Sequence, residues 1–212
     1  MSVQALLLDL DHTLFDPEAI PRSVMEPVFA ELRRINRRMR AVSEHELESA
    51  IPELMGSPIT LVAREHRWPD AFRQACLAAS AAVVLPDSLP VYPDVAAVVA
   101  LPQKKFLETS GVPTVQIRKV RSLGLDAWLD GIHVDDALAV PRPGKRAIFA
   151  GILEQQCLAP HDVAVVGDSL ESEIAAGSAL GLRTVHIARR GCSPDCPATH
   201  CMADLLRLAS VL

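Results

Sequence analysis

The chain has 212 residues, of which 50% are hydrophobic and 22% are charged, and its net charge is −5 with a pI near 5.8. The many apolar residues exclude an intrinsically disordered chain, and 16 prolines exclude a long coiled coil. Because the charge balance is acidic, no global positive field attracts nucleic acid, which we do not expect as a partner.

The N-terminal segment and the cysteines indicate the compartment. No apolar run approaches the roughly 20 residues of a membrane span. The N-terminus reaches Asp9 and Asp11 before the apolar region of a signal peptide could be completed. We therefore expect a soluble, cytoplasmic protein. Its five cysteines, an odd number, favour reduced thiols over a disulfide framework. The sequence carries no signal for oligomeric state.

The first predicted element is a buried strand over residues 5–10, and residues 16–90 then read as helical. A first helix is predicted by apolar residues at helical spacing, with arginines around them that we interpret as a solvated face. Ser43 and Glu46 form a capping-box pattern for a second helix, which runs toward Met55 and stops at residues 56–58. A third helix is predicted over residues 71–84, and residues 86–93 read as a linker.

Helix and strand signals alternate beyond the linker. Helices are predicted over residues 94–101, 113–123, 145–156, 171–180 and 204–212, and strands over residues 104–108, 132–134, 163–166 and 184–187. This alternation predicts a parallel sheet covered by helices on both faces. Sheets of this kind place their sites at the carboxyl ends of the strands.

Reactive side chains follow three of the predicted strands. The first strand ends in the sequence DLDHT at residues 9–13, the second in TSG at 109–111 and a third in GDS at 167–169, with Glu173 shortly after. Carboxylates that converge repel one another unless a cation lies between them, and an oxygen-only set suits Mg²⁺. Backbone N–H groups at such turns bind phosphate. A nucleophile, a cation and an anion site together predict phosphoryl transfer.

The motifs DLDHT, TSG and GDSxxxE, in this order, resemble motifs of the phosphatase branch of the haloacid dehalogenase superfamily. The resemblance implies an α/β fold, in which a three-layer αβα Rossmann-like core carries an inserted helical cap. Residues 1–15 and 91–212 would form the core, and residues 16–90 a helical C1-type cap that closes over the strand ends and selects the substrate.

The resemblance also implies the roles of individual residues. Asp9 would attack phosphorus, and Asp11 would protonate the leaving oxygen and then activate water. The TSG motif would bind the phosphoryl group through Thr109, Ser110 and Gly111. Mg²⁺ would be held by the Asp9 carboxylate, the Asp11 main-chain carbonyl and Asp168, with Glu173 as an outer partner.

The third motif departs from the family pattern. Relatives place a lysine six residues before a helical phenylalanine, but counting back from Phe149 leads to Pro143. Arg142 and Lys145 lie on either side of it. A cation is needed to pair with Asp9 and the incoming phosphate. We favour Lys145 as this cation and leave Arg142 as a substrate-binding alternative.

Asp11 distinguishes between reactions within the resembled family. Members that remove halide lack a carboxylate two residues after the nucleophile, since their leaving group needs no proton. We therefore predict a magnesium-dependent phosphatase acting on a small-molecule phosphate monoester. A sugar-phosphate mutase uses the same core motifs and stays open, as does a catalytically idle regulatory protein. The substrate cannot be named from the sequence.

A second set of metal-ligating residue types lies near the C-terminus. Cys192, Cys196, His200 and Cys201 have spacings within the range of zinc ligands. His200 and Cys201 are neighbours, however, and are poorly suited to share one metal, so the sequence disfavours a zinc site. His12 varies in the resembled family and receives no catalytic role. The other histidines, among them His186, have no spacing that suggests ligation.

Overall fold

The computed structural model describes residues 3–189 and 191–212. Within these residues, six parallel strands form one sheet in the order β3-β2-β1-β4-β5-β6, so that β1 lies in its interior. The strands are β1 (Ala5–Leu8), β2 (Lys104–Gly111), β3 (Gly131–Asp136), β4 (Val163–Gly167), β5 (Arg183–Ile187) and β6 (His200–Met202). The predicted α/β fold with a parallel sheet is therefore confirmed.

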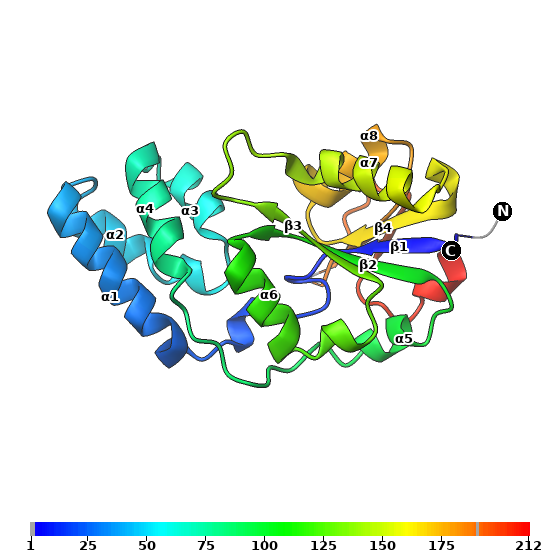
Figure 1. Ribbon diagram of the computed structural model, residues 1–212, viewed down its shortest axis with the longest axis horizontal. Helices are drawn as coiled ribbons and strands as arrows, with labels where there is room; N and C mark the ends of the chain where they lie inside the picture. The colour runs from blue at the N-terminus through cyan, green and yellow to red at the C-terminus, as the bar shows by residue number, and fades with distance from the viewer. Residues whose placement is uncertain (1–2, 190) are drawn as a thin grey trace.

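Helices cover both faces of the sheet (Figure 1). One face carries α7 (Gly144–Gln156) and α8 (Ala175–Ala179), and the other carries α5 (Val95–Val99) and α6 (Pro113–Ser122). Alternate residues of β1 point to opposite faces of the sheet. Since helices cover both faces, all four residues of the strand are buried. Leu6 and Leu8 pack toward α5 and α6, whereas Ala5 and Leu7 pack toward Phe149 of α7.

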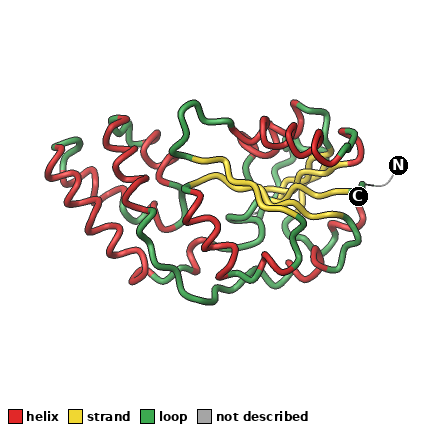
Figure 2. The backbone as a smooth tube through the Cα atoms, viewed as in Figure 1, coloured by secondary structure: helices red, strands yellow, loops and turns green. Residues whose placement is uncertain are grey.

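The remaining helices gather beyond the carboxyl ends of the strands (Figures 1 and 2). They are α1 (Arg22–Met39), α2 (Glu44–Ala50), α3 (Ile59–Glu65) and α4 (Asp70–Ser80). Their apolar sides form a hydrophobic cluster of their own, which includes the fully buried Phe29 and Phe72. The arginines of α1 lie on the outer side, where Arg33 pairs with Glu26 and Glu48. No helix among the described residues is long and apolar enough to cross a membrane.

Several element boundaries differ from the predictions. The capping box of Ser43 and Glu46 is present, but α2 ends at Ala50, just before Pro52, because proline lacks the N–H that continues a helix. The predicted helix over residues 171–180 begins as one π-helical turn, Leu170–Ile174. The predicted C-terminal helix is replaced by turns and the 3-10 helix Leu208–Val211. Short 3-10 turns also occur at Pro17–Ala19, Glu53–Met55, Leu125–Ala127 and Pro160–Asp162.

The cysteine prediction was wrong for one pair. Cys192 and Cys201 form a disulfide, while Cys76, Cys157 and Cys196 are free. Strand β6 pairs with β5, and residues 192–199, which precede β6, bring Cys192 against Cys201. An odd cysteine count argues against a disulfide framework, but it does not exclude one local bridge.

Candidate active site

The predicted site residues other than Arg142 meet at one edge of the sheet because β1 lies between β2 and β4. Asp9 follows β1 directly, and its backbone N–H donates to the carbonyl of Val166 at 2.9 Å. Asp168 follows the last residue of β4. Thr109, Ser110 and Gly111 are the last residues of β2. The carboxyl ends of three neighbouring strands therefore supply the polar groups, as expected for a parallel sheet.

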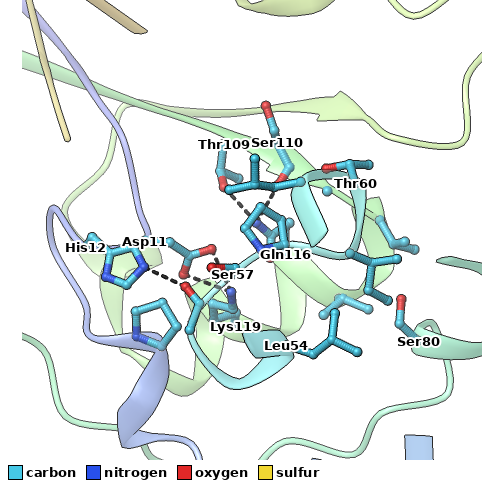
Figure 3. Close-up of a pocket in the computed structure, with 18 of the residues that line it drawn as sticks. Asp11, His12, Leu54, Ser57, Thr60, Ser80, Thr109, Ser110, Gln116 and Lys119 are labelled. Atoms are coloured by element: carbon cyan, nitrogen blue, oxygen red, sulfur yellow. Dashed lines mark hydrogen bonds and ion pairs between the residues drawn. The ribbon is translucent and has the colours of Figure 1, made fainter. Parts of the chain in front are cut away.

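These groups line a cavity of about 500 Å³. The core contributes the two aspartates of the first motif, the end of β2, Lys145 and Asp168. The opposite walls come from the segment of helices α1–α4, residues 22–80, which we call the helical segment. Its apolar and small polar side chains face the cavity (Figure 3). They include Leu54, Met55, Ile59, Thr60, Leu77 and Ser80. The cavity thus has a charged floor and a largely uncharged wall.

Lys145 lies at the centre of a buried charge cluster. Its Nζ is 2.7 Å from Oδ1 of Asp9 and 2.9 Å from Oε2 of Glu108, and it also contacts Glu173. All four side chains are at most 8% exposed. Lys145 therefore occupies the position next to Asp9 that a third-motif cation needs. Three carboxylates around one ammonium leave an excess of negative charge.

This excess charge and the burial shift the pKa values of the cluster. Burial raises the pKa of Asp9 well above its ordinary value, against the attraction of Lys145. Burial likewise raises the pKa of Glu108 to about 8 and, together with the charge of Glu173, that of Asp168 to about 6. Burial alone would lower the pKa of Lys145, but the surrounding carboxylates outweigh it and raise that pKa well above normal.

The acidic residues of the cluster also suit a divalent cation. Carboxylate oxygens of Asp9, Asp168 and Glu173 lie within 4.8 Å of one another. These are hard oxygen donors, which suit Mg²⁺, and they carry more negative charge than Lys145 balances. Gly167 permits the close approach of Glu173, because a Cβ at position 167 would lie 2.8 Å from the Glu173 Cγ. The residues present therefore fit Mg²⁺.

Asp11 and His12 form contacts that the sequence did not reveal. Both carboxylate oxygens of Asp11 accept hydrogen bonds from Lys119 Nζ of α6, at 2.8 and 2.9 Å (Figure 3). His12 adopts a positive φ of 58°, and its Nε2 lies 2.8 Å from the carbonyl of Gly56 in the helical segment. The turn after β1 therefore contacts both the core and the helical segment.

The TSG residues are held by neighbours on α6 and β3. Gln116 Nε2 donates to Thr109 Oγ1 at 2.7 Å and to the carbonyl of Ser110 at 3.0 Å (Figure 3). Ser110 Oγ donates to Asp135 Oδ2 at 3.0 Å. Gly111 has a φ of 154°, and a Cβ there would meet Gln116 at 3.1 Å, which explains glycine at this position.

Arg142 is directed away from this cluster. It pairs with Asp135, and it does not line the cavity among the described residues. Burial would raise the pKa of Asp135, but the hydrogen bond from Arg142 holds that pKa below its usual value. Asp135 also accepts from the backbone N–H of Gly144, the residue before Lys145. Arg142 therefore supports, through Asp135, the first turn of α7, which carries Lys145, and we assign it no contact with substrate.

Three residues of the site were not predicted from the sequence. Glu108 was read as part of a strand, and Gln116 and Lys119 as part of an ordinary helix. The last two lie one turn apart on α6, so they share one face of it, and both are buried. A signal for Gln116 and Lys119 was available in the sequence. Both are long polar residues on one side of the helix that follows the TSG motif, and that side faces the sheet.

Known proteins resemble the chain over nearly its full length. A sequence model of the haloacid dehalogenase-like hydrolases matches residues 3–181. A phosphoserine phosphatase of Thermus thermophilus is 26% identical over 231 positions, covering 92% of each chain. A HAD phosphatase structure from Thermococcus onnurineus covers 100% of the chain and 97% of its own, with a TM-score of 0.66 and 20% identity. An L-2-haloacid dehalogenase structure from Xanthobacter autotrophicus covers 99% of the chain and 98% of its own, with a TM-score of 0.59 and 17% identity. At these identities the structures show the fold alone.

Proposed function

The chain belongs to the haloacid dehalogenase-like hydrolases, and we propose that it hydrolyses small phosphate monoesters through an aspartyl-phosphate on Asp9. The observation that carries this proposal is the pair of aspartates on the cavity floor. Asp9 is buried beside Lys145, and Asp11, two residues later, presents a carboxylate to the same cavity. A nucleophile and a proton donor therefore face one space.

The reaction follows from the positions of these groups. Asp9 attacks phosphorus and forms the acyl phosphate, while Asp11 gives a proton to the departing alcohol oxygen. Asp11 then takes a proton from the water that attacks the acyl phosphate, which releases phosphate and restores Asp9. Lys119 holds the ionised Asp11 carboxylate in place, which is the form that takes the proton from water. Lys145 limits the repulsion between Asp9 and the phosphoryl group.

Further groups of the site assist binding of the phosphoryl group. Thr109, Ser110 and Gly111 line the cavity at the end of β2. The Thr109 hydroxyl accepts from Gln116 and can donate its own proton to a phosphoryl oxygen. Asp9, Asp168 and Glu173, with the main-chain carbonyl of Asp11, would hold Mg²⁺. When bound, this ion supplies positive charge that stabilises the phosphoryl oxygens in the transition state.

Asp11 favours phosphate esters over haloacids. A halide leaves without a proton, whereas an alkoxide leaving group needs one near neutral pH. The chain keeps a carboxylate at position 11 and holds it toward the cavity, where it would serve no purpose in halide release. This observation supports a phosphatase in a family whose solved structures include dehalogenases.

The helical segment supports a proposal for the substrate. We assign residues 16–90 as a cap over a core formed by residues 1–15 and 91–212. No arginine among the described residues lines the cavity, and its lysines, Lys119 and Lys145, are both paired with carboxylates. The wall facing the charged floor is mainly apolar. We therefore expect the organic part of the substrate to be uncharged and largely apolar.

A panel of phosphate monoesters assayed with Mg²⁺ tests the proposal. Free phosphate should appear fastest from esters of uncharged alcohols, and no free phosphate should appear in excess chelator.

Asp9→Asn should abolish turnover, and Asp11→Asn should slow it by about 10²–10⁴-fold. Asp126→Asn, an exposed aspartate outside the cavity, is the matched control. Undiminished activity of Asp9→Asn contradicts the mechanism. An isomerised sugar phosphate in place of free phosphate would instead identify a mutase.

A further inference from the structure

A second cluster of ligating side chains lies away from the cavity, at β5 and β6. His186 Nδ1 and the sulfurs of Cys196 and Cys201 lie within 4.8 Å of one another. The sulfur of Cys192 is bonded to that of Cys201 and therefore lies next to this group. One imidazole nitrogen and two sulfurs thus meet at one position in the fold, and a third sulfur adjoins one of them.

Strand register explains why His186 belongs to this cluster and His200 does not. His186 of β5 pairs with Cys201 of β6, and paired residues on neighbouring strands point to the same face of the sheet. His200 precedes Cys201 by one position and points to the opposite face. The sequence disfavoured a zinc site because His200 and Cys201 are neighbours, whereas the register supplies His186, which lies 15 residues before Cys201.

The distances suit a tetrahedral metal site. His186 Nδ1 is 3.4 Å from the Cys196 sulfur and 3.6 Å from the Cys201 sulfur. Zinc bonds of about 2.3 Å to sulfur and about 2.0–2.1 Å to nitrogen, at tetrahedral angles, separate the two ligand atoms by about 3.5 Å. Both distances lie within about 0.2 Å of that value.

The imidazole is also oriented as a metal ligand. His186 Nε2 lies 2.8 Å from the main-chain carbonyl of Asp168. A carbonyl oxygen can only accept, so Nε2 carries the proton and Nδ1 keeps its lone pair toward the sulfurs. A backbone carbonyl that fixes the ring of a ligating histidine in this way is a common feature of metal sites.

We propose that the chain with reduced cysteines binds one Zn²⁺ through His186 Nδ1 and the thiolates of Cys192, Cys196 and Cys201. Thiolate and imidazole ligands select zinc, whereas the carboxylates of the cavity select Mg²⁺, so the two sites are chemically distinct. The Cys192–Cys201 disulfide and zinc exclude one another, because the disulfide removes two of the four ligands. Zinc at this site would hold residues 192–201 together. Through the hydrogen bond from His186, it would also fix the backbone of Asp168, the residue that follows β4.

Cobalt titration of the whole chain tests the site. The protein is reduced with a phosphine: the phosphine is oxidised to its oxide with the oxygen of one water molecule, and the disulfide takes up two electrons and the two protons of that water to give two thiols. It is freed of metal and titrated with Co²⁺ in excess Mg²⁺. We expect one Co²⁺ per chain, with the intense near-ultraviolet absorption of cobalt–thiolate bonds, which carboxylate sites lack. One equivalent of Zn²⁺ should remove this band.

Variants identify the ligands. Cys196→Ser and His186→Gln should each weaken zinc binding by more than about 100-fold, beyond the roughly 10–100-fold effect of losing an outer partner. His200→Gln and Cys157→Ser are the matched controls and should bind zinc like the parent. Cys192→Ser cannot form the disulfide and keeps three ligands, so it should give the cobalt–thiolate band without reductant.

Two results would overturn the proposal. The first is the absence of the thiolate band from both the reduced parent and Cys192→Ser, which would leave a thiol–imidazole hydrogen bond beside a structural disulfide. The second is an equal loss of zinc binding in His200→Gln and His186→Gln. Neither result depends on phosphatase activity.

Discussion

The ammonium group of Lys145 is the positive charge around which the acidic residues of the cavity are arranged. A lone buried carboxylate would be protonated, and Asp9 could not then act as a nucleophile. The three carboxylates within reach of Lys145 hold the lysine charged, and Lys145 in turn lowers the pKa of Asp9 against the effect of burial. Lys145 therefore favours the reactive form of Asp9.

The two bases beside Pro143 should differ sharply in their effect on turnover. Lys145→Ala should lower kcat/KM by about 10–150-fold, because a charge-assisted hydrogen bond contributes roughly 1.5–3 kcal/mol. Arg142→Ala should stay within a few-fold of the parent, since Arg142 pairs with Asp135. Steady-state kinetics on the best monoester would measure both. A damaging Arg142→Ala with a mild Lys145→Ala would reverse the assignment.

Glu108 should make the stability of the metal-free protein depend on pH. Burial raises its pKa from 4.5 to about 8, so between these values the native state binds more protons than the unfolded chain. The free energy of unfolding should therefore fall as pH rises through this range. Glu108→Gln should reduce that slope, and a residual slope of the same sign should remain from Asp9 and Asp168. Urea unfolding in chelator measures it.

The exposed Glu154→Gln is the control for this experiment and should keep the full slope. If Glu108→Gln and Glu154→Gln show the same pH dependence, the raised pKa of Glu108 makes no measurable contribution to stability.

Most core elements were predictable because their signals are local. The apolar runs of β1 and β4 and the helix signals of α6 and α7 need no knowledge of distant residues. Strand β6 was missed because its three residues become a strand only by pairing with β5. The helix predicted over residues 204–212 does not form, since Asp94 Oδ2 accepts from the backbone N–H of Leu205 and helps hold that segment in turns.

The capping box of α2 gives a test at the level of one element. Ser43 Oγ accepts from the N–H of Glu46 at 3.2 Å, and the Glu46 carboxylate accepts from the N–H of Ser43 at 2.8 Å. Ser43→Ala should lower the free energy of unfolding by about 1 kcal/mol, since it leaves a helix N–H without a partner. Ser49→Ala is the control, because its hydroxyl only donates back to a carbonyl of the same helix. Equal effects in urea unfolding would contradict the capping role.

Over the whole molecule, the sheet brings together groups that lie as far apart in the chain as Asp9 and Glu173. The sequence predicted Asp9, Asp11 and Asp168 as site residues because each follows a strand that carries its own signal. It could not predict that Glu108 and Lys119 join them, since their positions depend on the packing of β2 and α6 against β1. Their positions are therefore set by tertiary packing, which no local pattern records.

The stability of the whole chain should also respond to Mg²⁺, because the ion would bind carboxylates that are buried only in the folded state. At a Mg²⁺ concentration of about 100 times Kd the gain is about 2.7 kcal/mol, which corresponds to a rise in Tm of roughly 5–10 °C for a chain of this size. NaCl at equal ionic strength should not reproduce the rise, and Asp126→Asn should respond like the parent.

Asp168→Asn should separate the charge of the site from its packing. Burial and Glu173 raise the pKa of Asp168 to about 6, so at pH 8 its ionised form lowers the stability of the metal-free fold. An asparagine of the same shape removes that charge, and the metal-free variant should therefore melt at or above the Tm of the parent. In Mg²⁺ the order should reverse, since the variant lacks a ligand that the parent has. Thermal unfolding at pH 8 with chelator and with Mg²⁺ measures both. An equal rise in Tm with Mg²⁺ in parent and variant would show that the ion binds without Asp168.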